Sequence, residues 1–229
     1  MSVNVDMKKP QSDAKGDLQV NNLVYRQPSA LSLAVSRKMC RQYFQRSAYS
    51  AGENAIIELN TGSSYINPHN SYLTFKLDLV GAGAEANFGV GSAINLIESI
   101  TIRSRSGTEL DRIDHVNLWA KDNIPHSFSE DWIGHFGSMV GYQGDGENVI
   151  TSGVIPTRYV IPLNLISGFF NPTGDQLVPP MLASGLHMTF EFARAATALV
   201  ETSGSVDGYN VTDISIVTDC TDLSDDAQK

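Results

Sequence analysis

The sequence predicts an all-β protein, an antiparallel β-sandwich of jelly-roll (Greek-key) type with one short helix and an extended N-terminal arm. Short segments with strand-type alternation recur from residue 54 onward, and turn residues divide them. No helical segments alternate with these strands, as a parallel sheet would require. The gaps between the segments are uneven, which favours Greek-key connections over an up-and-down barrel.

Seven segments have strand character, and one of them is especially clear. In residues 185–195, Leu186, Met188, Phe190 and Phe192 share one face, and mostly polar side chains occupy the other, which is the period of two of a half-buried strand. The expected strands are residues 54–59, 71–80, 95–104, 108–113, 158–166, 185–195 and 211–220.

Three connections are also predicted. Ser106-Gly107 indicates a tight hairpin between the third and fourth strands. Residues 114–122 have the pattern of a short helix with Asp114 as its cap. Residues 123–156 form a long connection, about twice the length of an ordinary loop.

Charge divides the chain into two unequal parts. Residues 1–46 carry eight bases and three acids, a net charge of +5, and residues 47–229 carry eight bases and 22 acids, a net charge of −14. The net charge of −9 excludes a surface that attracts nucleic acid as a whole. We therefore expect a basic extended arm over 1–52, a jelly-roll domain over 53–220 and an acidic polar tail or linker over 221–229.

The bases of the arm are the candidate assembly residues. They are Arg26, Arg37, Lys38, Arg41 and Arg46, and they lie in a stretch without acids. Such an arm can lie along an acidic face of a neighbouring subunit, or it can contact the phosphates of genomic DNA weakly. The bases are fewer than in a run that condenses a genome, which favours the neighbouring subunit.

No catalytic residue, cofactor or metal site is expected, and the protein is not predicted to be an enzyme. The five histidines, which are His69, His115, His126, His135 and His187, lack metal-site spacing. His126 and His135 bracket Glu130 and Asp131, which is a weak candidate for a metal or acid/base site.

Two further polar groups have simpler explanations. Asp114, His115 and Asp122 are better explained by a helix cap and surface polarity than by a pocket. Residues 141–148 contain Asp145 and Glu147 but lack the alternating ligands of a calcium loop, so a surface turn is expected.

Cys40 and Cys220 are predicted to be free thiols, because two isolated cysteines make a poor disulfide framework. No apolar run approaches the roughly 20 residues of a membrane span. These features predict a protein without a membrane span, made in a reducing compartment.

Four segments in succession resemble a known family. They are NSYLTFKLDL, SAINLIESITIRSRSGTELDRIDHVNLW, RYVIPLNLISGFFNPTGDQLVPPMLASGLHMTFEFARA and VTDISIVTDCTDLSD. Over about residues 43–224 the chain resembles major capsid proteins of the double jelly-roll lineage, of the polinton-like virus, virophage and adintovirus type. Family members fuse two jelly rolls, so the chain is either an N-terminal jelly roll alone or a single jelly-roll capsid protein.

The resemblance implies a structural viral capsid protein of the virion, assembled in the host cell interior. Its subunits would form homotrimeric capsomers that tile an icosahedral shell around double-stranded DNA, with penton or minor cement proteins as further partners. The basic arm would run under the shell and connect neighbours. Deletion of residues 1–46 is then predicted to impair assembly and leave the sandwich folded.

The alternative function is a jelly-roll carbohydrate-binding or receptor-binding module, such as a fibre head. Such modules display aromatic platforms, and only Trp119 and Trp132 are available here. The low aromatic content of 8% counts against this alternative.

Overall fold

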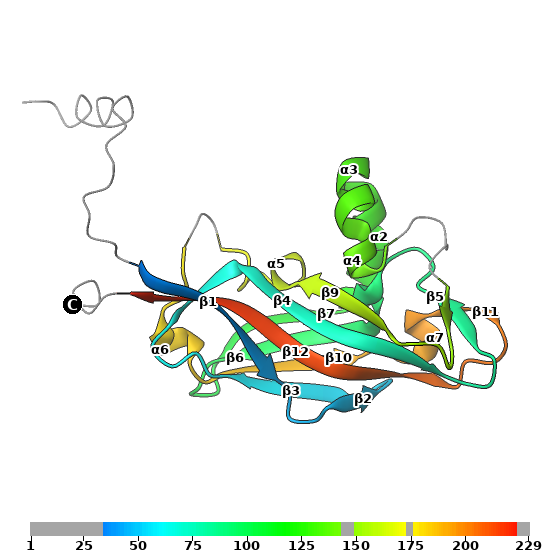
Figure 1. Ribbon diagram of the computed structural model, residues 1–229, viewed down its shortest axis with the longest axis horizontal. Coiled ribbons are helices and arrows are strands. Elements are labelled where there is room, and N and C mark those ends of the chain that lie inside the picture. The colour runs from blue at the N-terminus through cyan, green and yellow to red at the C-terminus, as the bar shows by residue number, and fades with distance from the viewer. Residues whose placement is uncertain (1–33, 143–148, 173–175, 224–229) are drawn as a thin grey trace, which may run out of the picture.

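The computed structural model describes residues 34–142, 149–172 and 176–223. Two antiparallel sheets face each other across the core (Figure 1). Sheet A contains, in spatial order, β1 (Ala34–Tyr43), β12 (Gly208–Leu223), β4 (Tyr65–Val80) and β9 (Thr157–Pro162), and β2 (Ala48–Ser50) also pairs with β12. Sheet B contains β3 (Asn54–Leu59), β10 (Leu186–Phe192), β6 (Ile97–Arg103) and β7 (Glu109–Asp114).

The order of these strands is that of a jelly roll. In chain order the eight principal strands are β1, β3, β4, β6, β7, β9, β10 and β12. Sheet A holds the first, eighth, third and sixth of them, and sheet B holds the second, seventh, fourth and fifth. The chain therefore wraps so that its earliest strands pair with its latest ones, and the predicted antiparallel sandwich of jelly-roll type is confirmed.

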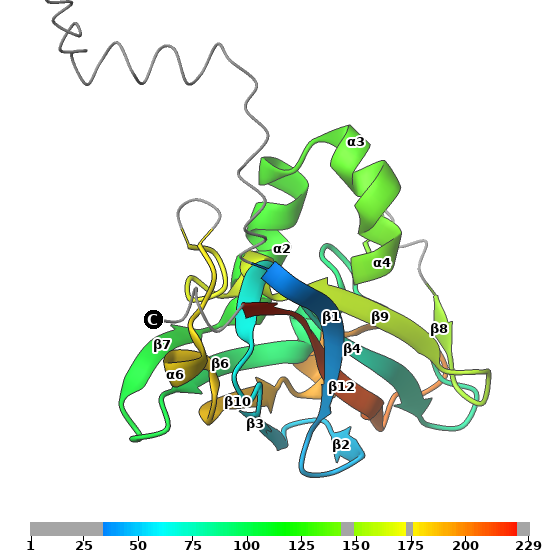
Figure 2. The same ribbon diagram turned by 60° about the vertical axis from the view of Figure 1, so that its left-hand side comes forward.

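The remaining elements lie outside sheets A and B. A small sheet C is formed by β11 (Val200–Ser203), β5 (Glu85–Asn87) and β8 (Ile150–Thr151). The helical segments are η1 (Ala93–Leu96), α2 (Val116–Ser127), α3 (Glu130–Trp132), η2 (Ile133–Gly137), α4 (Ser138–Val140), α5 (Leu163–Ile166), α6 (Pro180–Ala183) and α7 (Ala195–Ala198). Figures 1 and 2 show α2 and the α3–α4 segment standing out from the sandwich together as a helical projection.

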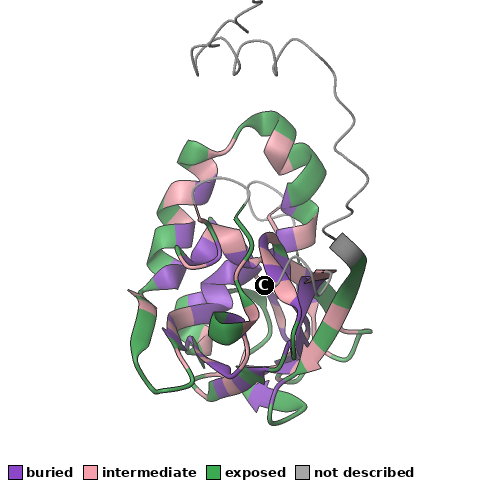
Figure 3. Cartoon of the chain, turned by 90° about the vertical axis from the view of Figure 1, so that its left-hand side faces the viewer, coloured by how far each residue is buried: buried purple, intermediate pink, exposed green. Residues whose placement is uncertain are grey.

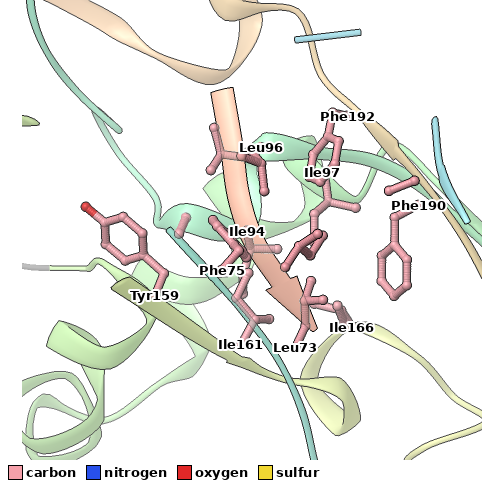
Figure 4. Packing of buried hydrophobic residues seen from close by; sticks show 14 of the residues in the cluster. Leu73, Phe75, Ile94, Leu96, Ile97, Tyr159, Ile161, Ile166, Phe190 and Phe192 are labelled. Atoms are coloured by element: carbon pink, nitrogen blue, oxygen red, sulfur yellow. The ribbon is translucent and has the colours of Figure 1, made fainter. Parts of the chain in front are cut away.

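The core lies between the facing sides of sheets A and B. Leu186, Met188, Phe190 and Phe192 of β10 are all buried, as the alternation in the sequence predicts. Figure 4 shows Phe190 and Phe192 gathered with side chains from sheet A such as Phe75. Because apolar burial is the main stabilising term in folding, this core determines the register of both sheets.

The predicted arm is part of the sandwich from Ala34 onward. Residues 34–52 include β1 and β2, which both pair with β12. Between these strands Phe44 is buried, with its ring centroid 5.7 Å from that of Phe190. The described part of the arm expected over 1–52 therefore packs with the sandwich, and residues 1–33 lie outside the described residues. At the other end β12 continues to Leu223, beyond the boundary expected after residue 220.

The helix content exceeds the one short helix that the sequence predicts. The helix expected over 114–122 is α2, but Asp114 does not cap it. Asp114 is the last residue of β7, where it pairs with Arg112 at 3.2 Å, and His115 takes the position before the helix with φ 58°. The hairpin at Ser106-Gly107 is confirmed, with Gly107 at φ 86° between β6 and β7.

Two other expectations about secondary structure are wrong. The long connection over 123–156 contains the end of α2, the helical run from α3 to α4, and β8. The strand expected over 158–166 ends at Pro162 and continues as α5, because Leu163 and Ile166 are buried at a spacing of three rather than two.

Candidate assembly surface

Strand β1 forms one edge of sheet A and carries most of the candidate assembly residues. Within the described residues β1 pairs only with β12, from Ala34 opposite Leu223 to Tyr43 opposite Ser215. Arg37, Lys38 and Arg41 are exposed on it, and Figure 3 shows this strand coloured mostly as exposed. An edge strand with charged side chains on both faces resists pairing with strands of other chains.

Arg37 forms an ion pair with a buried carboxylate on the neighbouring strand. Its Nε donates to Asp219 Oδ1 at 2.8 Å, and its Nη2 also donates to Asp219 Oδ2. Asn70 of β4 donates to the same carboxylate at 3.1 Å. The Asp219 side chain is 1% exposed, while that of Arg37 is 62% exposed. The hydrogen bond from Arg37 is the main reason that the pKa of Asp219 is lowered.

A second carboxylate anchors the beginning of β1. Asp222 accepts hydrogen bonds from Ser64, from Ser36 at 2.7 Å and from Lys38 at 3.1 Å. These three donors, with Ser64 first, lower the pKa of Asp222 to about 2. Two carboxylates of β12 therefore fasten β1 to sheet A.

We expect acid to weaken this attachment. The pKa values of Asp219 and Asp222 are lowered in the folded state and return to about 3.9 on unfolding. Their stabilisation is fully present above about pH 5 and is lost as the pH falls through the folded pKa values. Urea midpoints measured at about pH 7, 5 and 3 should fall at the acid end.

The control for this prediction is Asp222→Asn, which cannot titrate at that position. Its urea midpoint should already be lower at neutral pH and should decline less between about pH 4 and 2 than that of the wild type. Equal declines in the two proteins would contradict a role for Asp222.

The other candidate residues also have partners in their own chain. Arg46 forms an ion pair with Glu53 at 2.9 Å and places its guanidinium carbon 4.9 Å from the centre of the Tyr49 ring. Arg41 places its guanidinium carbon 5.8 Å from the centre of the Tyr43 ring. Arg26 lies outside the described residues. Arg37, Lys38 and Arg46 thus pair with acids of this chain, whereas the sequence favoured acids of a neighbouring subunit.

A third carboxylate on the same sheet gathers two bases. Asp213 lies at an irregularity of β12 with φ 50°, and it forms ion pairs with Arg158 of β9 and with Lys76 of β4 at 3.7 Å. The hydrogen bond from Arg158 is the main reason that the pKa of Asp213 is lowered. The sequence analysis did not identify Asp213, Asp219 and Asp222. The observation that could have indicated them is the cluster of acids near the C-terminal end of the sequence, opposite in charge to the basic N-terminal region.

A groove lies on the outer side of sheet A beside these charges. Its volume is about 490 Å³, and its lining includes Met39 of β1, Tyr72 of β4, Val160 of β9 and Met139 of α4. Asp219 and Arg37 also line it. The groove is therefore mainly apolar, with His69, Asn70 and Ser71 as polar residues of its lining and the Arg37–Asp219 pair as its charged point.

The predicted metal and acid/base candidates are not brought together. Among the described residues no group of three or more His, Cys, Asp and Glu side chains could hold a metal ion. His115 Nδ1 lies 3.0 Å from Glu98, and His135 Nδ1 lies 2.7 Å from the carbonyl oxygen of Asp131. Most of the possible calcium loop, residues 143–148, lies outside the described residues.

Cys40 and Cys220 lie on neighbouring strands as free thiols. Burial raises the pKa of Cys220 to about 11, so this thiol is poorly reactive near neutral pH. In the part of the chain that the structure describes, no helix is long and apolar enough to cross a membrane.

The two tryptophans do not form a free aromatic platform. Trp132 stacks on Phe128 with ring centroids 4.2 Å apart, and Phe136 follows at 6.3 Å. Trp119 lines a separate hollow of about 230 Å³ beside α5. In this stack the ring faces of Phe128 and Trp132 contact each other, and a bound sugar would need such a face.

Comparisons with known proteins identify the fold. No family model matches the sequence, and no curated protein matches it either. Among solved structures, VP54 of PBCV-1, fitted into a reconstruction of the virophage Sputnik, is 14% identical with a TM-score of 0.59, and the match covers 89% of this chain and 45% of that chain. A chain of the PBCV-1 virus capsid is 16% identical with a TM-score of 0.58, covering 88% of this chain and 44% of that chain.

A chain of the Sputnik virophage, solved by cryo-EM, is 10% identical with a TM-score of 0.50, covering 97% of this chain and 53% of that chain. The protein therefore spans about half the length of the chains it matches. At these identities the likeness shows the fold alone. It confirms that the chain has the jelly-roll fold implied by its resemblance to double jelly-roll capsid proteins.

Proposed function

We propose that the protein is a structural capsid protein of a DNA virus, a jelly-roll subunit that assembles with copies of itself into an icosahedral shell. The observation that carries this proposal is the complete jelly-roll order of sheets A and B, shared over 88% of the chain with a chain of the PBCV-1 virus capsid. Homotrimeric capsomers, a location in the virion and contacts with penton or minor cement proteins belong to the same proposal. The role requires no catalytic residue or cofactor.

Within this proposal the assembly arm consists of residues 1–33, because β1 already belongs to sheet A. The described bases Arg37, Lys38 and Arg46 hold β1 and its following turn in place through acids of the same chain. Residues 1–33 contain four bases and three acids, so any contact of this arm with genomic DNA would be weak. Connection of neighbouring subunits is the role that we propose for the arm.

Negative-stain electron microscopy of the purified full-length protein tests the proposed function. The expected result is trimers, and shells under assembling conditions. A protein lacking residues 1–33 should keep its far-UV circular dichroism spectrum and assemble poorly. Normal shells from this truncated protein would contradict the role of the arm, and monomers alone from the full-length protein would contradict the capsid function.

The carbohydrate-binding alternative is not favoured. A glycan array would show specific binding that is lost in Trp132→Ala if this alternative were correct. The stacking of Trp132 on Phe128 provides a structural reason for this substitution to disturb the helical projection instead.

A further inference from the structure

The outer face of sheet A carries an apolar band, although such a face in water is normally polar. Met39 and Tyr43 of β1 lie on this face, with Tyr72 of β4 and with Val160 and Pro162 of β9. Met39 is 56% exposed and Tyr43 is 64% exposed. Antiparallel sheets with one solvated face usually place polar side chains there. The described residues of a single copy leave this band uncovered.

The apolar band continues into the groove below the helical projection. Figure 2 shows α4 on the same side of the sandwich as β1 and β9. Met139 of α4 lines the groove of about 490 Å³ together with Met39. Methionine side chains adapt their shape to a partner, which suits a surface that accepts an apolar insertion.

The charged residues around this band are mainly basic. Apart from Asp78, which lies beside Val149 and Ile155 near the end of β4, the outward residues of sheet A include four bases and two acids, which are Arg37, Arg41, Lys76 and Arg158 with Asp213 and Asp219. The whole chain has 16 bases and 25 acids, so this face is more basic than the chain as a whole. Within the described residues Arg41 forms no direct ion pair; its guanidinium lies over the Tyr43 ring, and its charge helps to lower the pKa of Asp213.

The end of the sandwich around sheet C is apolar and acidic, and it therefore complements the outer face of sheet A. Six aliphatic side chains are exposed there, and we call this region the valine end: Val80, Val90, Val149, Val154, Ile155 and Val200. Residues 77–90, 149–157 and 199–208, which form it, contain no lysine or arginine. Their acids are Asp78, Glu85, Glu201 and Asp207.

Hydrogen bonds join these three segments into one end of the molecule. β5 pairs with β8 and with β11 in sheet C. The backbone N–H of Asp207 donates to the carbonyl of Val80 at 2.9 Å, and that of Ser152 donates to the carbonyl of Ala84 at 2.9 Å. Ile155 is 89% exposed, next to Val154 in the loop before β9. Exposed apolar groups gathered on a soluble protein mark an interaction site.

We propose that the valine end of one copy docks on the outer face of sheet A of a second copy, with Ile155 and Val154 seated in the groove. This inference rests on the proposed self-assembly and names the surfaces that carry it. Both apolar character and charge match, because an acidic apolar end meets a basic apolar face. A second copy is the partner because the same chain presents both surfaces.

The contact joins two different surfaces and is therefore heterologous. Each copy that offers its valine end to one neighbour keeps its groove free for another. Such head-to-tail contacts form a closed ring when the rotation from each copy to the next adds up to one full turn. The proposed capsomer requires a ring of three copies.

Substitutions in the full-length protein test the proposed contact by analytical ultracentrifugation. Met39→Glu places a charge in the groove, and Ile155→Glu places one on the valine end, both at exposed positions. Each variant should self-associate at least about tenfold more weakly than the wild type. Met181→Glu is the matched control, because Met181 on α6 is 97% exposed and belongs to neither surface. Its self-association should equal that of the wild type.

Mixing the two variants distinguishes a heterologous contact from loss of folding. The Met39→Glu chain keeps its valine end, and the Ile155→Glu chain keeps its groove, so the mixture should form a one-to-one dimer and no ring. A mixture that stays monomeric would overturn the proposed pairing of the two surfaces, as would either variant associating like the wild type. Shells formed by the wild type and by both variants would refute this inference and leave the capsid function standing. A wild type that never associates would contradict both.

Discussion

Deletion of residues 1–46 should abolish stable folding, and deletion of residues 1–33 should not. The longer deletion removes β1, which covers one edge of β12, and it removes Phe44 from the core. Loss of a buried phenylalanine side chain alone costs about 3–5 kcal/mol, out of a total stability of about 5–15 kcal/mol for a typical domain. The deletion also leaves the buried Asp219 without its base.

Urea unfolding followed by circular dichroism checks this result. The protein lacking 1–33 should unfold at nearly the wild-type midpoint, while the protein lacking 1–46 should be insoluble or unfold without a cooperative transition. A cooperative transition at the wild-type midpoint in the protein lacking 1–46 would show that β1 is dispensable. This expected outcome differs from the one predicted from the sequence, in which the deletion of residues 1–46 leaves the sandwich folded.

Asp219→Ala should destabilise the protein by about 3 kcal/mol. The carboxylate is buried and accepts charge-assisted hydrogen bonds from Arg37 and Asn70, so its removal breaks these bonds and weakens the attachment of β1 to β12 near the centre of the strand. The free energy of unfolding in urea measures the loss.

Asp222→Ala is the matched control for this substitution. Asp222 also lies on β12 and also pairs with a base of β1, but its side chain is 30% exposed. Exposed ion pairs contribute little to stability, and the other donors to Asp222 are the hydroxyls of Ser36 and Ser64, so this variant should lose less than Asp219→Ala. Equal losses in the two variants would show that burial of Asp219 is not the source of its contribution.

The sequence predicts the interior strands well because their environment is periodic. In β10 one face meets the core and the other meets a more polar surface, so Phe190 and Glu191 differ in burial as they differ in chemistry. The same reasoning fails for β1, whose residues Ser36 to Met39 are exposed on both faces. An edge strand of this kind leaves no alternation to detect.

The contacts of the candidate site could not be predicted from spacing. Arg37 and Asp219 lie 182 positions apart, and only the order of strands in the sheet brings them together. The helical run through Trp132 did leave a signal, because Phe128, Trp132 and Phe136 recur every four residues and their rings stack in the structure. This spacing of four residues is typical of a helix, and it predicts one within residues 123–156.

The pairing of β1 with β12 has a consequence for how the protein is made. Cys40 and Thr218 are joined across these strands although 178 positions separate them. At the usual rates of synthesis of about 5–20 residues per second, β1 waits on the order of ten seconds or more for its partner. During that time its open edge is available to other nascent chains. Such distant pairing also slows folding itself, because sheet A cannot be completed before β12 has been synthesised.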